Sequence, residues 1–153
     1  PSPCSPHFET NQLLNEIEYL ICDVGFLWRK RNNLLARELG MCVLDRRILI
    51  KLELSPGITQ VELAERIEVE PQSLTRIIDR LEKKAWVERQ TSPDDRRAKC
   101  LFLTPAVGPI LIRIHKAMNE FRPLALEGVS AEDVKCIEEK LQIIKTNIVG
   151  HLG

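Results

Sequence analysis

The sequence predicts a mainly α-helical fold with one small β-hairpin, and three observations support this prediction. Most apolar residues recur at intervals of three and four, which is the period of an amphipathic helix. Two short helical segments near the middle of the chain are separated by only about three residues. Two later segments have the pattern of short strands and are separated by a polar turn. With 153 residues, the chain has the size of one domain and can bury a core.

The first predicted helix covers residues 11–39, where apolar residues form one continuous stripe. Gly40 favours the end of the helix. Residues 1–10 begin with three prolines in six positions and have no apolar period, which predicts a loose N-terminal arm.

Residues 105–150 predict two further helices. Thr104, which is followed by proline, and Ser130 are typical of helix N-termini, and Pro123 is expected to kink or end the first helix. The stripes at both ends of the chain are long, and one small domain has limited surface on which to bury both. An interface between two copies would bury both stripes, so we expect residues 11–39 and 105–150 to be dimerisation helices.

The central segment, residues 41–104, has the pattern of a winged helix-turn-helix. A helix over residues 44–54 stops at a Ser-Pro-Gly turn. The next helix opens at Thr59, which forms a capping box with Glu62, and Pro71 is expected at the first position of the helix after it. The apolar residues of these two helices are expected to face inward: Leu63, Ala64, Ile67, Leu74, Ile77, Ile78 and Leu81.

A hairpin follows the helix-turn-helix. Residues 86–89 are expected to form a half-buried strand, residues 100–103 are expected to return as the second strand, and a polar turn over residues 90–97 joins them. A hairpin in this place is a wing. The predicted fold class is therefore a winged helix-turn-helix flanked by N- and C-terminal dimerisation helices.

The charge distribution favours a nucleic-acid partner, although the formal net charge of the chain is zero. Residues 72–99 contain eight basic and five acidic residues, a net charge of +3, so the rest of the chain carries −3. The positive charge thus lies on the helix-turn-helix and the wing, as a DNA-binding surface requires.

The fourth predicted helix is the candidate for base recognition. In a helix-turn-helix, the N-terminal part of the second helix enters the major groove. Four polar residues there are candidates for contacts with base edges: Gln72, Ser73, Thr75 and Arg76. Arginine can donate two hydrogen bonds to guanine, and glutamine can pair in a bidentate way with adenine.

Phosphate contacts are expected farther along this helix and at the tip of the wing. The candidates are Arg80 and Lys83 on the helix, together with Lys84, and Arg96 and Arg97 on the wing, where a long cation can enter a narrow minor groove. Asp79 would repel the DNA backbone, so we expect it to pair with Lys83 or Arg76.

From Gln60 to Thr104 the sequence resembles the MarR family of bacterial transcription regulators, and its SlyA branch in particular. The most specific part is DDRRAKCLFLT, which fits the family's D-x-R followed by L-T at these positions: Asp95, Arg97, Leu103 and Thr104. The resemblance implies that Arg97 enters the minor groove and that Asp95 supports the wing. It also implies that Ser73 and Arg76 act in the major groove.

The same resemblance implies a cytoplasmic homodimer that binds a pseudo-palindromic operator on double-stranded DNA. It also implies that the protein is a repressor or antirepressor and that it responds to a small aromatic or phenolic effector.

Three residues depart from the family pattern. Ala85 replaces a common glycine after the recognition helix, so we expect that helix to end in another conformation. Cys42 and Arg46 replace a threonine cap and an aromatic residue near the ligand cleft of the family.

Other function classes have little support in the sequence. No G-x-S-x-G, phosphate loop or paired-carboxylate pattern appears, so we expect no enzymatic activity and no cofactor. The three histidines are dispersed, which predicts no metal site, and no apolar run reaches the roughly 18–20 residues of a membrane span. The five cysteines are scattered without C-x-x-C spacing, as in a reducing cytoplasm, and no secretory signal is expected.

Two alternatives to this interpretation stay open at the level of sequence. A winged helix reused for protein contact would keep the apolar skeleton but lose the cations at Arg76, Arg96 and Arg97. A thiol switch on DNA binding would use a cysteine such as Cys22, which lies inside the first predicted helix. No basic residue is adjacent to Cys22, and a buried small side chain explains it adequately. Cys4 lies in the predicted arm.

Overall fold

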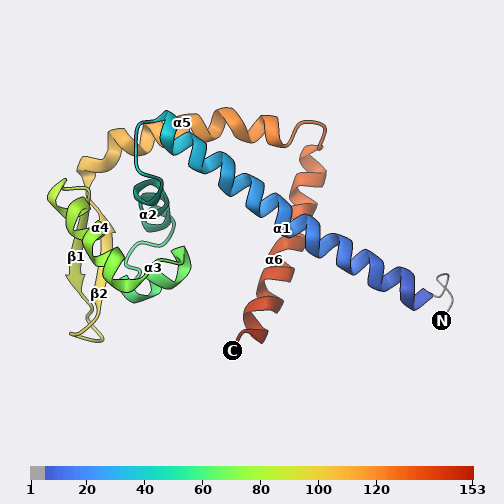
Figure 1. The fold of residues 1–153 in the computed structure, drawn as a ribbon, viewed down its shortest axis with the longest axis horizontal. Helices are drawn as coiled ribbons and strands as arrows, with labels where there is room; N and C mark the ends of the chain where they lie inside the picture. The colour runs from blue at the N-terminus through green and yellow to red at the C-terminus, as the bar shows by residue number, and fades with distance from the viewer. Residues whose placement is uncertain (1–5) are drawn as a thin grey trace. The chain divides into compact units, whose positions relative to one another are not determined.

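A computed structural model describes residues 6–153 and confirms the predicted fold class, a mainly helical chain with one two-stranded antiparallel hairpin (Figure 1). The chain forms two compact units, one up to His115 and one from Lys116 onward. The boundary lies within helix α5 (Gly108–Ala125). No helix among the described residues is long and apolar enough to cross a membrane.

The first unit begins with the long helix α1 (Pro6–Glu38). Residues 6–10, which we expected in the loose arm, are therefore helical, and residues 1–5 of that arm, with Cys4, lie outside the described residues. Among the side chains of α1 that the structure describes, those of Leu35 and Ala36 near the C-terminal end are buried and join the core. All described side chains of residues 10–27 are exposed, so the expectation that Cys22 is a buried small side chain is wrong for the single chain.

Three helices form the centre of the first unit: α2 (Val43–Leu54), α3 (Gln60–Ile67) and α4 (Pro71–Lys83). The predicted cap of α3 is confirmed in part. The Thr59 hydroxyl accepts a hydrogen bond from the backbone N–H of Glu62 at 3.2 Å, while the Glu62 carboxylate pairs with Arg66 at 2.6 Å. Pro71 occupies the first turn of α4, as predicted.

The wing consists of β1 (Val87–Thr91) and β2 (Lys99–Leu103), paired in register from Val87↔Leu103 to Thr91↔Lys99. The outer edge of β2 also pairs with the loop before α3, through a bridge between Thr59 and Cys100. The backbone N–H of Leu101 donates to the carbonyl of Ile58 at 3.0 Å. The hairpin is thus hydrogen-bonded on both sides of β2.

The core of the first unit lies between these helices and the base of the wing. The inward faces that we predicted for the third and fourth helices are confirmed, because each of these apolar side chains is buried: Leu63, Ala64, Ile67, Leu74, Ile78 and Leu81. Ile77, also predicted to face inward, is half-buried. Val87 and Leu101 extend the core into the wing, and Ile114 extends it into the start of α5. Buried side chains therefore connect α4 and the wing to one core.

Helices α1, α3 and α4 are each followed by a residue in the left-handed conformation, at Gly40, Glu68 and Ala85, with φ of 69°, 56° and 59°. At the end of α4 the N–H of Trp86 donates to Leu81 O and that of Ala85 donates to Glu82 O. This pair of bonds is a Schellman motif. The expectation that Ala85 would end the helix in another conformation is therefore wrong: alanine takes the conformation that glycine adopts without strain.

The second unit contains the end of α5 and helix α6 (Ala131–His151). The predicted cap is confirmed, because the Ser130 hydroxyl accepts from the N–H of Asp133 at 3.0 Å. Pro123 lies in the last turn of α5, which ends at Ala125. In α6 no side chain is buried, so its apolar stripe stays open to solvent in the single chain.

Replacing Ala85 with glycine should stabilise the protein. An L side chain in the left-handed region costs roughly 1–2 kcal/mol, and glycine avoids this cost. Part of the gain is offset, because the unfolded chain with glycine has more conformational entropy to lose on folding. We expect Ala85→Gly to raise the free energy of unfolding by up to about 1 kcal/mol in urea denaturation. Gly40→Ala is the matched control, because a Cβ there meets no atom within 4 Å and only the backbone conformation opposes it. That variant should lose stability, and a gain from both substitutions would contradict the prediction.

Candidate nucleic-acid interface

The N-terminal half of α4 presents free polar groups. Gln72, Ser73 and Arg76 are exposed, and within residues 6–153 no side-chain hydrogen bond or ion pair engages them. Lys83, at the other end of the helix, is also exposed. These four predicted contact residues are therefore available to a ligand.

Thr75 differs from these residues, because its hydroxyl already has two partners. It donates to the carbonyl of Pro71 at 3.0 Å and accepts from Nε2 of Gln60 at 2.8 Å. Its side chain is nevertheless exposed and lines a hollow of about 410 Å³ between the start of α4 and the wing, together with Gln72 and Arg97.

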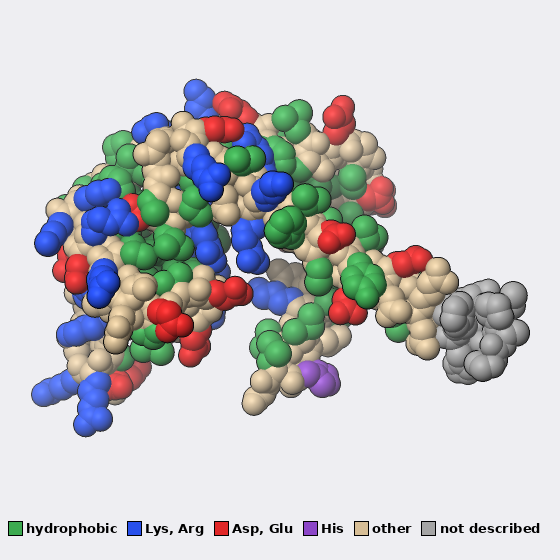
Figure 2. Space-filling view, in the orientation of Figure 1, with side chains coloured by type: hydrophobic (Ala, Val, Ile, Leu, Met, Phe, Trp, Pro, Cys, Tyr) green, Lys and Arg blue, Asp and Glu red, His purple; other side chains and the backbone are tan. Residues whose placement is uncertain are grey.

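The tip of the wing carries Arg96 and Arg97, both exposed. Figure 2 shows Lys and Arg side chains gathered where the tip of the hairpin lies in Figure 1. Oδ1 of Asp95 accepts from the backbone N–H of Arg97 at 2.9 Å, and its carbonyl accepts from Ala98 at 3.0 Å. These bonds form an Asx-type turn, the kind of contact that the expected support of the wing by Asp95 requires.

Arg80 does not lie as we expected for a phosphate contact. Both of its terminal nitrogens donate to the carboxylate of Asp45, at 2.7 and 2.5 Å. The Asp45 side chain is only 3% exposed, whereas that of Arg80 is 43% exposed. Hydrogen bonding to Asp45 raises the pKa of Arg80, so the guanidinium stays charged. A phosphate could bind Arg80 only in competition with a buried carboxylate, and this geometry gives no support to that role.

Arg89 is the residue that sequence reasoning missed. Its guanidinium donates to Asp79 at 2.6 Å and to Glu82 at 3.2 Å, and its Nε donates to Gln60 at 3.2 Å. The expected partners of Asp79, Lys83 and Arg76, are therefore wrong. The side chain of Arg89 is 19% exposed, and its contacts connect β1 with both α3 and α4. Alternation along β1 could have found it, because Arg89 shares the inward face with Val87.

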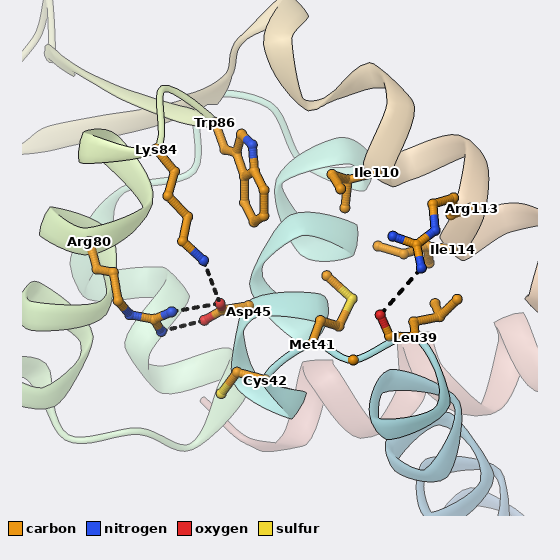
Figure 3. A pocket seen from close by; sticks show the side chains of 11 residues that line it. Leu39, Met41, Cys42, Asp45, Arg80, Lys84, Trp86, Ile110, Arg113 and Ile114 are labelled. Carbon is orange, nitrogen blue, oxygen red and sulfur yellow. Dashed lines mark hydrogen bonds and ion pairs between the residues drawn. The ribbon is translucent and has the colours of Figure 1, made fainter.

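A second hollow, of about 210 Å³, lies within the first unit on the other side of α4 (Figure 3). Arg80 and Lys84 reach from α4 and its C-terminal cap toward Asp45 of α2, and Lys84 also lies over the ring of Trp86, 4.6 Å from its centroid. The other lining residues are mostly apolar, and they also include Arg113: Leu39, Gly40, Met41, Cys42, Ile110, Arg113 and Ile114. The hollow therefore combines cations with an apolar wall.

Two residues near this hollow, Cys42 and Arg46, are those that we identified as departures from the MarR family pattern. Cys42 is the N-cap of α2, and its side chain makes no capping hydrogen bond, so the role of a threonine cap is lost. Arg46 is buried, with 4% of its surface exposed. The position that commonly holds an aromatic residue thus holds a buried cation here.

Residues 45–99 match the sequence model of the MarR family. This segment of the chain is therefore similar to the MarR family domain. The match spans α2, the helix-turn-helix and β1 and ends at the first residue of β2, so it covers the elements that carry the exposed polar residues and the arginines described above.

Solved structures resemble more of the chain. Wild-type MarR from E.coli in its apo form is 26% identical, with a TM-score of 0.65, over 83% of this chain and 94% of that one. The transcriptional regulator SlyA is 25% identical, with a TM-score of 0.60, over 86% and 93%. A MarR transcriptional regulator from Methanosarcina mazei Go1, at 20% identity and a TM-score of 0.68 over 87% and 98%, shares the fold. The chain thus has the winged-helix fold of MarR-type transcriptional regulators.

Removal of Arg80 should lower the free energy of unfolding more than removal of its ion-pair partner Asp45. Arg80→Met leaves a buried carboxylate with only Lys84 nearby, at 3.9 Å, and should cost roughly 2–3 kcal/mol of unfolding free energy. Asp45→Ala leaves an arginine that can turn to solvent and should cost about 1 kcal/mol. Urea denaturation of both variants measures the difference, and an equal or reversed order would contradict the burial that we describe.

Proposed function

We propose that this protein is a sequence-specific DNA-binding transcription regulator of the MarR type, that it acts as a homodimer on a pseudo-palindromic operator, and that it is not an enzyme. The proposal includes the SlyA-like branch, a cytoplasmic location in a bacterium and the role of a repressor. The motif DDRRAKCLFLT supports the branch assignment.

One observation carries the DNA-binding part of the proposal. The start of α4 and the tip of the wing both present arginines without an internal carboxylate partner among the described residues, at Arg76, Arg96 and Arg97. Other basic residues of the same region, Arg80 and Arg89, are paired with carboxylates inside the protein. Folding thus satisfies some cations and leaves those that we assign to DNA available.

The exposed apolar stripes support the homodimer. In α1 the apolar side chains spaced by three and four are exposed: Leu13, Ile17, Leu20, Val24 and Leu27. In α6 the same holds for Ile137, Leu141 and Ile148. Exposed apolar surface of this extent marks an interaction site. A two-fold dimer would pair two copies of α4, so each half-site would lie about one helical turn of DNA from the other.

An effector is the remaining part of the proposal. The hollow beside Asp45 offers the cations of Lys84 and Arg113 and the ring of Trp86, whereas Arg80 is paired with Asp45. A small aromatic or phenolic molecule with a negative charge suits this combination, because the ring can pack on apolar side chains while the anion binds the cations.

Two single substitutions should separate base recognition from backbone binding. Arg76→Ala should relax the preference for one base pair in each half-site, at a cost of roughly 1–3 kcal/mol on the preferred sequence and little on others. Arg97→Ala should weaken binding to most sequences alike and reduce the slope of log K against log salt by about 1 for each phosphate that is no longer neutralised. Operators selected from random duplexes, with affinities measured at several salt concentrations, test both.

The wild-type protein must first bind duplex DNA at low salt. Absence of binding to random and selected duplexes would refute the DNA-binding function and favour a winged helix that binds protein. An equal loss on all sequences from Arg76→Ala would instead reject only the base-reading role of Arg76. Lys135→Ala, on a helix of the second unit, is the control for removal of a cation elsewhere and should leave the salt slope unchanged.

Leu141→Glu should weaken the dimer. Leu141 lies on the exposed stripe of α6, and a dimer would bury its carboxylate replacement on both copies. We expect the dissociation constant measured by sedimentation to rise at least about tenfold, the effect of roughly 1.4 kcal/mol. Thr146→Glu, on the opposite side of the same helix, should leave it unchanged. A wild-type protein that is monomeric at all concentrations would refute the homodimer.

A further inference from the structure

The hydrogen bonds of Thr75 determine what this residue can offer to a base. A threonine hydroxyl has one proton and two acceptor lone pairs. In this structure the proton goes to the carbonyl of Pro71, one turn earlier in α4, and one lone pair accepts from Gln60 of α3. With its only proton used, the hydroxyl cannot donate to a guanine or thymine oxygen or to a purine N7, and its remaining lone pair can only accept, as from an adenine or cytosine amino group.

The partner Gln60 is itself held in one orientation. Its Oε1 accepts from Nε of Arg89 at 3.2 Å, which turns the amide NH₂ toward Thr75. The same guanidinium donates to the carbonyl of Thr75 at 3.3 Å and is fixed by Asp79. These contacts fix the rotamer of Thr75 from two sides, with the hydroxyl directed at α3 and at the helix backbone.

The methyl group is then the part of the Thr75 side chain that has no hydrogen-bonding task. Thr75 is exposed in the first half of α4 and lines the hollow between this helix and the wing, beside Gln72 and Arg97. The major-groove edge of a base pair offers one apolar group, the C5 methyl of thymine, and threonine methyl groups contact it.

We propose that Thr75 is a specificity-determining residue that selects thymine through contact between the two methyl groups, and that Gln60 is the positioning residue that makes this contact possible. The inference rests on the proposed function. It names one preferred base at one position of each half-site.

Deoxyuridine scanning tests the proposal, because deoxyuridine pairs as thymidine does and lacks only the methyl group. In the operator selected by the wild-type protein, one thymine per half-site should weaken binding about fourfold when replaced, the factor that burial of one methyl group provides. Thr75→Val keeps the methyl group, and the helix itself favours one rotamer of valine, so this variant should keep the sensitivity without Gln60. Gln60→Ala removes the bond that orients Thr75 and should reduce the sensitivity. Thr75→Ser keeps both hydrogen bonds and should lose it.

Thr146→Ser is the matched control, because the Thr146 hydroxyl makes the same bond to the carbonyl four residues earlier, at 2.9 Å, but lies in α6. Its deoxyuridine profile should equal that of the wild type. An identical profile for wild type and Thr75→Ser, or loss of the sensitivity in Thr75→Val, would overturn the proposal while leaving the DNA-binding function in place. A wild-type protein that selects no operator would overturn both.

Discussion

The orientation of α4 is the constraint on which the rest of the structure depends. Its apolar face is completely buried at Leu74, Ile78 and Leu81, which fixes the helix against the core. Two arginine–carboxylate pairs then hold its polar flanks: Arg80 binds Asp45 of α2, and Arg89 of the wing binds Asp79. Rotation of the helix about its axis would break both, so the exposed side chains at its start keep one direction.

The two ion pairs differ in what they contribute. Asp45 is buried, so its pair with Arg80 offsets the cost of desolvating a carboxylate and sets the position of α4 relative to α2. The carboxylates around Arg89 are about half exposed, and such pairs contribute little to stability one by one. These ion pairs instead fix the position of the wing relative to α4, the helix whose start we assign to the major groove.

The helical periods, caps and strand alternation were sufficient to predict the fold, because these signals are local. The inward faces of α3 and α4 and the caps at Thr59 and Ser130 followed from spacing alone. Contacts between distant residues did not follow. Nothing local joins Arg80 to Asp45, which are 35 positions apart, so Arg80 was taken for a surface cation. The left-handed Ala85 was missed for another reason: three tertiary and backbone bonds around it, including that from the Thr104 hydroxyl to its carbonyl, outweigh its own preference.

The attachment of the wing has a practical consequence. Both edges of β2 are hydrogen-bonded, to β1 and to the loop before α3, whereas residues 92–98 form the turn beyond the ladder. Extra residues inserted between Ser92 and Pro93 would lengthen this turn without breaking any strand pair or exposing any core side chain. The tip of the hairpin is thus the place where wings of different length can be exchanged between relatives on an unchanged scaffold.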